Sequence, residues 1–180
     1  MKYLLLGNGD IADQPMPEAD CVIQFNLCDH RDLVAPETQR FIFISNSGEP
    51  AARTVDFLRA NANHPAIAGA MIICARNPGF YRLKQCWLRL TFSKAWRHYR
   101  VSPAPGRLPK FETLTFPDAV RLERVMRHAG MPRTMMPSTG MIAWDWVHRR
   151  MHPGDHLSIA GFTWQGWEGH AWDIERRLML

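Results

Sequence analysis

The chain has 180 residues, enough to bury a sizeable hydrophobic core, and we expect residues 1–180 to form a single domain. Its hydrophobic fraction of 46% and charged fraction of 22% are ordinary for a soluble globular protein. The formal net charge of +5 favours anionic partners, but the absence of any run of five like charges argues against nucleic acid.

The sequence predicts neither a membrane anchor nor a disulfide framework. No segment approaches the roughly 20 apolar residues that span a bilayer, and Gly7 interrupts the N-terminal apolar run before a signal peptide could form. The four cysteines lack the close pairs of a zinc or redox motif, and Cys21 and Cys74 sit inside apolar runs. We therefore expect buried free thiols and a cytoplasmic protein.

Short apolar runs predict five β-strands, and periodic segments between them predict helices. The strands are expected at residues 2–6, 21–25, 40–45, 70–74 and 156–162, and the helices at residues 51–60, 78–96, 117–129, 138–151 and 173–180. Pro117 and Gly130 punctuate the third helix. Strands that alternate with helices predict an α/β fold, a Rossmann-like three-layer α/β/α arrangement with a mostly parallel sheet.

A glycine-rich turn, Gly7-Asn8-Gly9-Asp10, follows the first strand and fits three interpretations. Residues 7–12 match the G-x-G-x-x-A fingerprint of NAD-linked Rossmann proteins. However, Pro15 and Pro17 would cut the required helix, and residues 24–26 lack the acidic residue that binds ribose. The turn could also be merely tight, or it could bind phosphate in another way.

The segment Pro137-Ser138-Thr139-Gly140 precedes an apolar helix. A hydroxyl residue at this position is an ordinary helix cap, worth about 1 kcal/mol. The start of a helix is also a ready anion site, because its unpaired amides and its dipole converge there. The segment therefore fits either a simple cap or a phosphate contact.

His170 ends a loop, residues 164–170, that is rich in aromatic residues and glycine, as active-site loops often are. A lone histidine is more often structural, but a sugar transfer to a hydroxyl needs a base, and histidine has a suitable pKa. No metal is expected. His148 and His152 are four residues apart, but Pro153 ends their helix, and Asp13, Asp29 and Asp32 form no D-x-D motif.

Together these segments resemble the sialyl motifs of the eukaryotic-type sialyltransferases, glycosyltransferase family 29. Gly7-Asn8 and Asp20-Cys-Val-Ile-Gln-Phe-Asn26 are similar to the large motif, with Gly9-Asp10 and Gln24 as departures from it. Residues 137–140, about twenty residues before Gly161-Phe162, resemble the small motif, and His170 with Glu175 has the spacing of the very small motif. The third motif has no clear match, and residues 47–130 carry almost no resemblance.

The resemblance implies a variant GT-A-like fold and a short, soluble, bacterial-type member of the family. It implies that Asn8, Asn26 and the 138–140 turn hold the CMP part of a CMP-sugar donor, with Gly7 and Gly9 in the phosphate-binding turn. His170 would be the catalytic base, and Glu175 a structural or orienting partner. The implied acceptor is a glycan or a lipopolysaccharide-type molecule, and no cofactor is implied. A nucleotide-binding protein without transferase activity and an NAD-linked Rossmann protein remain alternatives.

Overall fold

The computed structural model describes residues 1–11, 16–44, 48–74, 111–114 and 116–180. The helix predicted over residues 78–96 lies outside these ranges.

In the described part of the chain, six strands form an all-parallel sheet in the order β5-β4-β3-β2-β1-β6. The strands are β1 (Lys2–Leu6), β2 (Cys21–Phe25), β3 (Gln39–Ile44), β4 (Met71–Cys74), β5 (Phe111–Thr113) and β6 (His156–Ala160). The α/β class and the parallel sheet are therefore confirmed, and five strands fall within two residues of their predicted ends. The sequence analysis missed β5 because a three-residue strand is too short to show a period.

The helices are η1 (Arg31–Leu33), α1 (Gly48–Ala60), α2 (Pro65–Ala68), α5 (Phe116–His128), α6 (Thr139–His148) and α7 (Trp172–Met179). Four of them were predicted, with ends that differ by at most three residues. The short α2 was not predicted, although its start carries two cues. His64 accepts a hydrogen bond from the amide of Ala66 at 3.2 Å, and Pro65 occupies the first turn.

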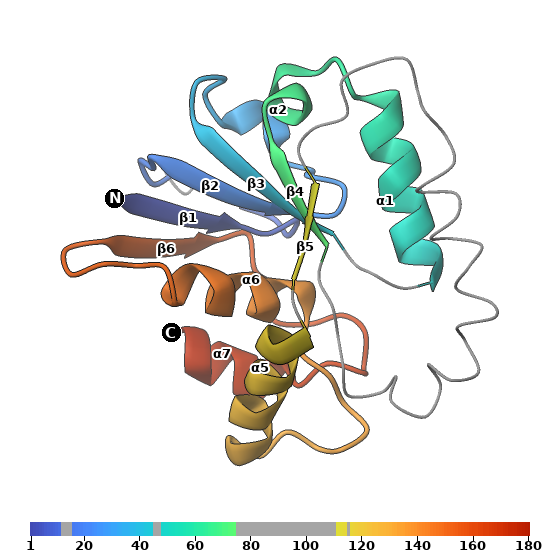
Figure 1. Cartoon of the computed structure of the whole chain (residues 1–180), viewed down its shortest axis with the longest axis vertical. Coiled ribbons are helices and arrows are strands. Elements are labelled where there is room, and N and C mark those ends of the chain that lie inside the picture. Colours follow the sequence, from blue (N-terminus) through green and yellow to red (C-terminus); the bar gives the residue numbers. More distant parts are fainter. Residues whose placement is uncertain (12–15, 45–47, 75–110, 115) are drawn as a thin grey trace.

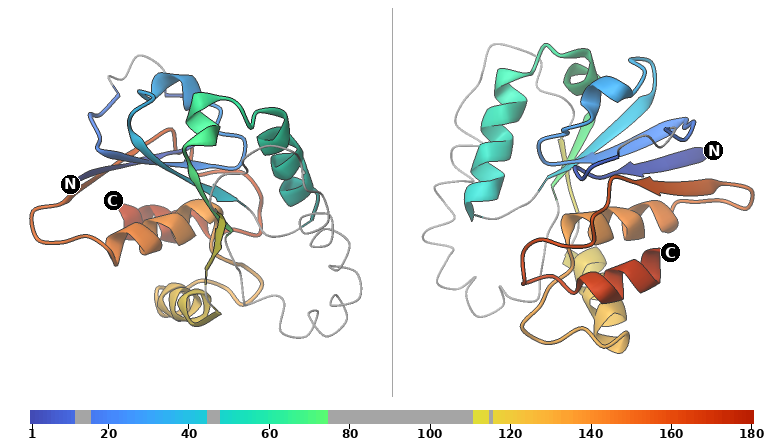
Figure 2. Two further views of the ribbon diagram at one scale, coloured as in Figure 1. Left: turned by 45° about the horizontal axis from the view of Figure 1, so that its top comes forward. Right: turned by 180° about the vertical axis from the view of Figure 1, so that it is seen from behind.

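Helices cover both faces of the sheet. Figure 1 shows α5, α6 and α7 on one face and α1 and α2 on the other, and the turned views in Figure 2 agree. Successive strand residues point to opposite faces, so Leu5 and Ile23 pack toward α6 whereas Leu4 and Val22 pack on the other side. Because both faces are buried, the central strands are continuous apolar runs.

Helix α6 is held on the sheet by Trp146. The ring of Trp146 lies 4.9 Å from Phe41 and 5.6 Å from Phe43, measured between centroids. The guanidinium of Arg150 covers the same indole at 4.0 Å from its centroid. On the same helix, the buried carboxylate of Asp145 accepts hydrogen bonds from Arg121 and from Arg149. These contacts fix the position of the helix, and with it the position of its first turn.

Candidate functional site at the carboxyl edge of the sheet

All strands of a parallel sheet end at one edge, and the strand arrowheads in Figure 1 point to it. The chain runs outward from β1 through β2, β3, β4 and β5, and then returns to place β6 on the opposite side of β1. Ligands of open parallel sheets bind at the carboxyl edge where the strand order reverses. In this sheet that place lies between β1 and β6.

The glycine turn after β1 packs directly against the segment after β6. The amide of Gly7 donates to the carbonyl of Ala160 at 2.8 Å, and the amide of Gly9 donates to that of Gly161 at 2.8 Å. A Cβ atom on Gly7 would lie 2.1 Å from the Gly161 oxygen. The need for glycine therefore comes from the contact between two backbones. Both amides are occupied by protein carbonyls rather than free for a pyrophosphate.

The two candidate asparagines lie at the ends of the adjacent strands β1 and β2. The side chain of Asn8 donates to the carbonyl of Phe25 at 3.0 Å and accepts from the amide of Asp29 at 3.3 Å. Asn26 has a positive φ of 49°, and its amide donates to the carbonyl of Phe43 at 2.9 Å. Asn8 thus ties its turn to the end of β2 and holds the neighbouring loop.

His30 is a further contact of the turn that the sequence analysis missed. Its Nε2 atom lies 2.7 Å from the carbonyl oxygen of Gly9, so Nε2 carries the hydrogen and donates. No motif in the sequence marks this residue, because the contact joins two loops that are 21 residues apart.

The start of α6 lies beside the end of β6. Ser138 caps the helix, with its hydroxyl oxygen accepting from the amide of Met141 at 3.1 Å. A Cβ atom on Gly140 would lie 2.7 Å from the ring of Phe162, which in turn meets the edge of Phe25 at a centroid distance of 5.6 Å. The predicted segments around Gly7 and Ser138 therefore meet at Phe162.

The first turn of α6 has backbone donors that no described residue pairs. The amide of Met141 is satisfied by the cap, and that of Ile142 donates to the carbonyl of Ser138 at 3.0 Å. Among the described residues, none accepts a hydrogen bond from the amides of Thr139 and Gly140. Two amides at the positive end of the helix dipole can therefore bind an anion.

Glu175 anchors this helix start from α7. Its side chain is 1% exposed, and its two oxygens accept from the amide of Ser138 at 2.8 Å and from the Ser138 hydroxyl at 2.5 Å. Burial raises the pKa of Glu175, whereas the two hydrogen bonds from Ser138 oppose that shift. Glu175 therefore acts on the helix cap, and its hydrogen bonds go to Ser138 rather than to His170.

His170 is held by the segment that leads into the cap. Its Nδ1 atom lies 2.9 Å from the carbonyl oxygen of Met136, and the amide of Met136 donates to the carbonyl of Gly169 at 2.9 Å. Because a carbonyl only accepts, Nδ1 carries the hydrogen, and the neutral ring has its lone pair on Nε2. No described residue bonds Nε2. Burial lowers the pKa of His170, and the bond to Met136 partly offsets this.

Together, these contacts form one chain from Glu175 through Ser138 and Met136 to His170. The carbonyl of Met136 is the link that the sequence analysis missed, and no residue pattern could have found it, since any residue supplies a carbonyl there. The half-buried ring of His170 also meets Trp167 and Trp172 edge-on, at centroid distances of 4.9 and 5.1 Å.

Metal-ligating residues do not gather within the described ranges. No three His, Cys, Asp or Glu side chains there are arranged to hold an ion. His148, weighed above as a zinc ligand, ends α6 and stacks on Trp144 at a centroid distance of 4.9 Å.

Comparisons with protein-family models, with curated proteins and with solved structures found no match to this chain. In the part of the chain that the structure describes, no helix is both long and apolar enough to cross a bilayer.

Proposed function

We propose that this protein is a sialyltransferase-like, inverting glycosyltransferase that moves a sialic-acid-like 2-keto sugar from a CMP donor to a glycan hydroxyl without a metal. The fold we propose is a Rossmann-like, variant GT-A-like glycosyltransferase domain spanning residues 1–180. Cys21 and Cys28 are free and buried, in keeping with a reducing compartment, and we propose the cytoplasm.

The observation that carries the proposal is the set of contacts around His170. A histidine that acts as a general base must be unprotonated, and therefore neutral, at working pH and must present a lone pair to its substrate. The bond from Nδ1 to Met136 fixes the required tautomer, the lowered pKa keeps the ring neutral near pH 7, and no described residue occupies Nε2. Glu175 supports this arrangement by fixing Ser138, two residues beyond Met136.

The proposed step transfers one proton and one glycosyl group. Nε2 of His170 takes the proton of the acceptor hydroxyl, whose oxygen forms a bond to the anomeric carbon. The bond from that carbon to the donor phosphate oxygen breaks, and CMP leaves with the electron pair. Attack opposite the leaving group inverts the anomeric configuration.

The amides of Thr139 and Gly140 are the best candidates to bind the donor phosphate. They lie at the edge of the sheet where its topology favours a ligand, and Asn8 and Asn26 end neighbouring strands there. A phosphate at these amides lies beside Ser138, whose own amide and hydroxyl are already bonded to the Glu175 carboxyl. The amides of Gly7 and Gly9 are already bonded, which weighs against the NAD-linked alternative.

A nucleotide-binding protein without transferase activity is the second candidate, favoured by the lack of a third sialyl motif. Thermal-shift titration with CMP, CMP-sialic acid, NAD and UDP-glucose distinguishes the transferase, the nucleotide-binding protein and the NAD-linked protein, because a bound ligand raises the melting temperature by mass action. We expect CMP and CMP-sialic acid to stabilise the protein and NAD and UDP-glucose to have no effect. A response to NAD alone would overturn the proposal. A response to CMP with neither hydrolysis nor transfer of the sugar would select the binding protein.

A further inference from the structure

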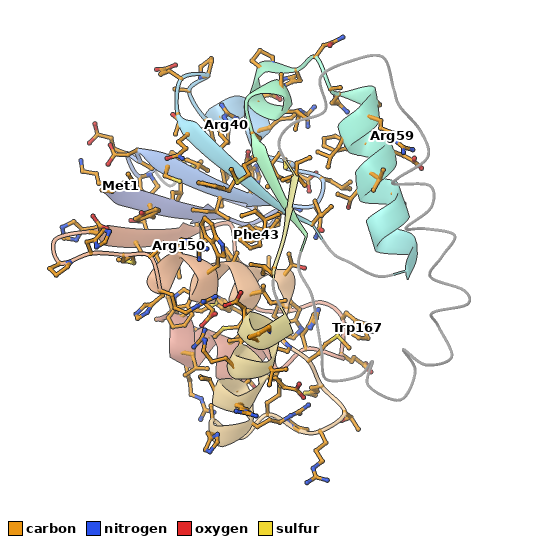
Figure 3. All side chains as sticks on the ribbon, viewed as in Figure 1. Met1, Arg40, Phe43, Arg59, Arg150 and Trp167 are labelled. Carbon is orange, nitrogen blue, oxygen red and sulfur yellow. The ribbon has the colours of Figure 1, made fainter. Side chains whose placement is uncertain are left out.

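Trp167 is the one aromatic side chain among the large hydrophobic residues that the described structure leaves exposed, at 60%. Single exposed hydrophobic residues are common and need no explanation by themselves. Trp167 differs because it stands on the loop that joins β6 to α7, three residues before His170. Figure 3 labels it on the side toward which the strands point.

The indole of Trp167 packs against Gly169. A Cβ atom on Gly169 would lie 2.3, 2.4 and 2.5 Å from three neighbouring carbons of the ring. Such similar distances mean that Gly169 lies beneath the face of the indole rather than beside its edge. Protein backbone therefore covers one face of the indole, and the exposed area belongs to the remainder of the ring.

The backbone around Trp167 is fixed as well. Its carbonyl accepts hydrogen bonds from the amide of His170 at 3.2 Å and from the indole of Trp172 at 3.2 Å. The imidazole of His170 meets the Trp167 ring nearly at right angles, at 87° and with centroids 4.9 Å apart. A largely exposed aromatic ring thus lies directly beside the proposed base.

We infer that Trp167 is a stacking platform for a pyranose ring of the glycan acceptor. The inference rests on the proposed function and adds the binding contact for its second substrate. The face of an indole carries negative charge density, which attracts the partly positive C–H hydrogens on one face of a sugar ring. A sugar seated there lies next to the imidazole of His170, and Gln165 and Glu168, exposed neighbours of Trp167 in the sequence, carry hydrogen-bonding groups.

The surroundings favour a sugar over a protein partner. Protein interfaces gather several large apolar residues into one buried patch. Within the described part of the chain, the exposed residues next to Trp167 in the sequence are Gln165, Gly166 and Glu168, which are polar or lack a side chain. One aromatic face among polar groups is typical of sites that bind ligands rich in hydroxyls, because polar groups fix orientation there.

The test follows indole N–H signals in two-dimensional NMR spectra of the full chain, with the Trp167 signal identified by its loss in Trp167→Phe. Methyl β-galactoside, methyl β-glucoside and lactose are the probes, and CMP is titrated separately. We expect at least one sugar to shift the Trp167 signal in a saturable way. Trp167→Ala should lower the affinity for that sugar by tenfold or more, whereas Trp167→Phe should lower it by less. In these variants binding is followed through the Trp172 signal. Leu33→Ala, an exposed change on η1, is the control and should bind like the parent.

A second variant tests whether the position of the Trp167 indole matters, and not only its presence. Gly169→Ala places a methyl group where the indole now lies, so the ring must move while its chemistry stays. We expect a loss of sugar affinity comparable to that of Trp167→Ala, with CMP affinity unchanged within twofold. If CMP binds and no sugar perturbs Trp167, the platform is refuted and the donor site stands. If neither CMP nor any sugar binds, the proposed function is refuted, and the inference that rests on it falls as well. If CMP shifts the Trp167 signal and the sugars do not, the platform belongs to the nucleobase and the inference is wrong.

Discussion

Replacement of Glu175 tests how the site is held together. Glu175→Ala removes both acceptors of the Ser138 amide and hydroxyl and leaves a buried amide without a partner. An unsatisfied buried donor costs about 1–3 kcal/mol, and a hydrogen bond to a charged group contributes about 1.5–3 kcal/mol. The desolvation of the carboxylate, which is the cause of its raised pKa, offsets part of this loss. We expect the free energy of unfolding to fall by about 2–4 kcal/mol.

Glu175→Gln is the matched variant, because it keeps the volume of the side chain and one acceptor oxygen. It should lower the free energy of unfolding by about half as much as Glu175→Ala does. The side-chain oxygen of the glutamine still accepts from the backbone amide of Ser138, but the second acceptor oxygen is lost. Urea unfolding followed by tryptophan fluorescence at pH 7 measures both values. Equal stabilities of parent and Glu175→Ala would refute the claim that Glu175 anchors the cap.

The raised pKa of Glu175 also predicts how its contribution to stability changes with pH. The folded pKa of Glu175 is raised above the ordinary value of 4.5, so the native state binds its proton more tightly than the unfolded state does. The contribution of this group is therefore fully present below pH 4.5 and is lost as pH rises through the raised pKa. Glu175→Gln lacks that dependence. The stability difference between parent and Glu175→Gln should grow as pH falls from 7 toward 4.5, and a shrinking difference would contradict the reasoning.

Three further predictions concern the rest of the site. The acid limb of the pH–rate profile for transfer should lie below pH 6.5, because burial lowers the pKa of His170 and the ring must be neutral to act as a base; a limb above 6.5 would argue against that residue. Gly7→Ala should destabilise the fold by about 2–4 kcal/mol in urea unfolding, because its methyl group meets the backbone of Gly161, whereas Gly69→Ala, with its nearest atom at 3.8 Å, should change stability by less than about 0.5 kcal/mol. Asn8→Ala should weaken CMP at least fivefold in calorimetry, since it frees the loop after β2, and unchanged CMP affinity would remove Asn8 from the donor site.

The sequence predicted the elements of this fold well, because strands that are buried on both faces are unbroken apolar runs. It could not predict β5, which has three residues, or the order of the strands, which depends on crossovers that no local pattern encodes. The fingerprint at Gly7 and Gly9 shows the limit most clearly. Motif reasoning left open whether this turn binds a phosphate or is merely tight, whereas the structure bonds both amides to the carbonyls of Ala160 and Gly161.

The candidate site was predictable only for residues that act through their side chains. Spacing selected His170 and Glu175, but it did not reveal that Glu175 bonds to Ser138 or that the carbonyl of Met136 fixes the imidazole. Backbone groups carry no residue signature, and their positions follow from tertiary packing. Contacts between loops, such as that of His30 with Gly9, are hidden for the same reason.

The central claim is that His170 is the base in a transfer from a CMP-sugar, and one paired measurement tests it. Transfer from CMP-sialic acid to lactose and the dissociation constant for CMP are measured in the parent and in His170→Ala. We predict that the rate falls by at least about 100-fold, the smallest usual contribution of a general base, while CMP affinity stays within twofold. Equal rates of transfer in the two proteins, or the absence of transfer by the parent to any glycan tried, would contradict the account.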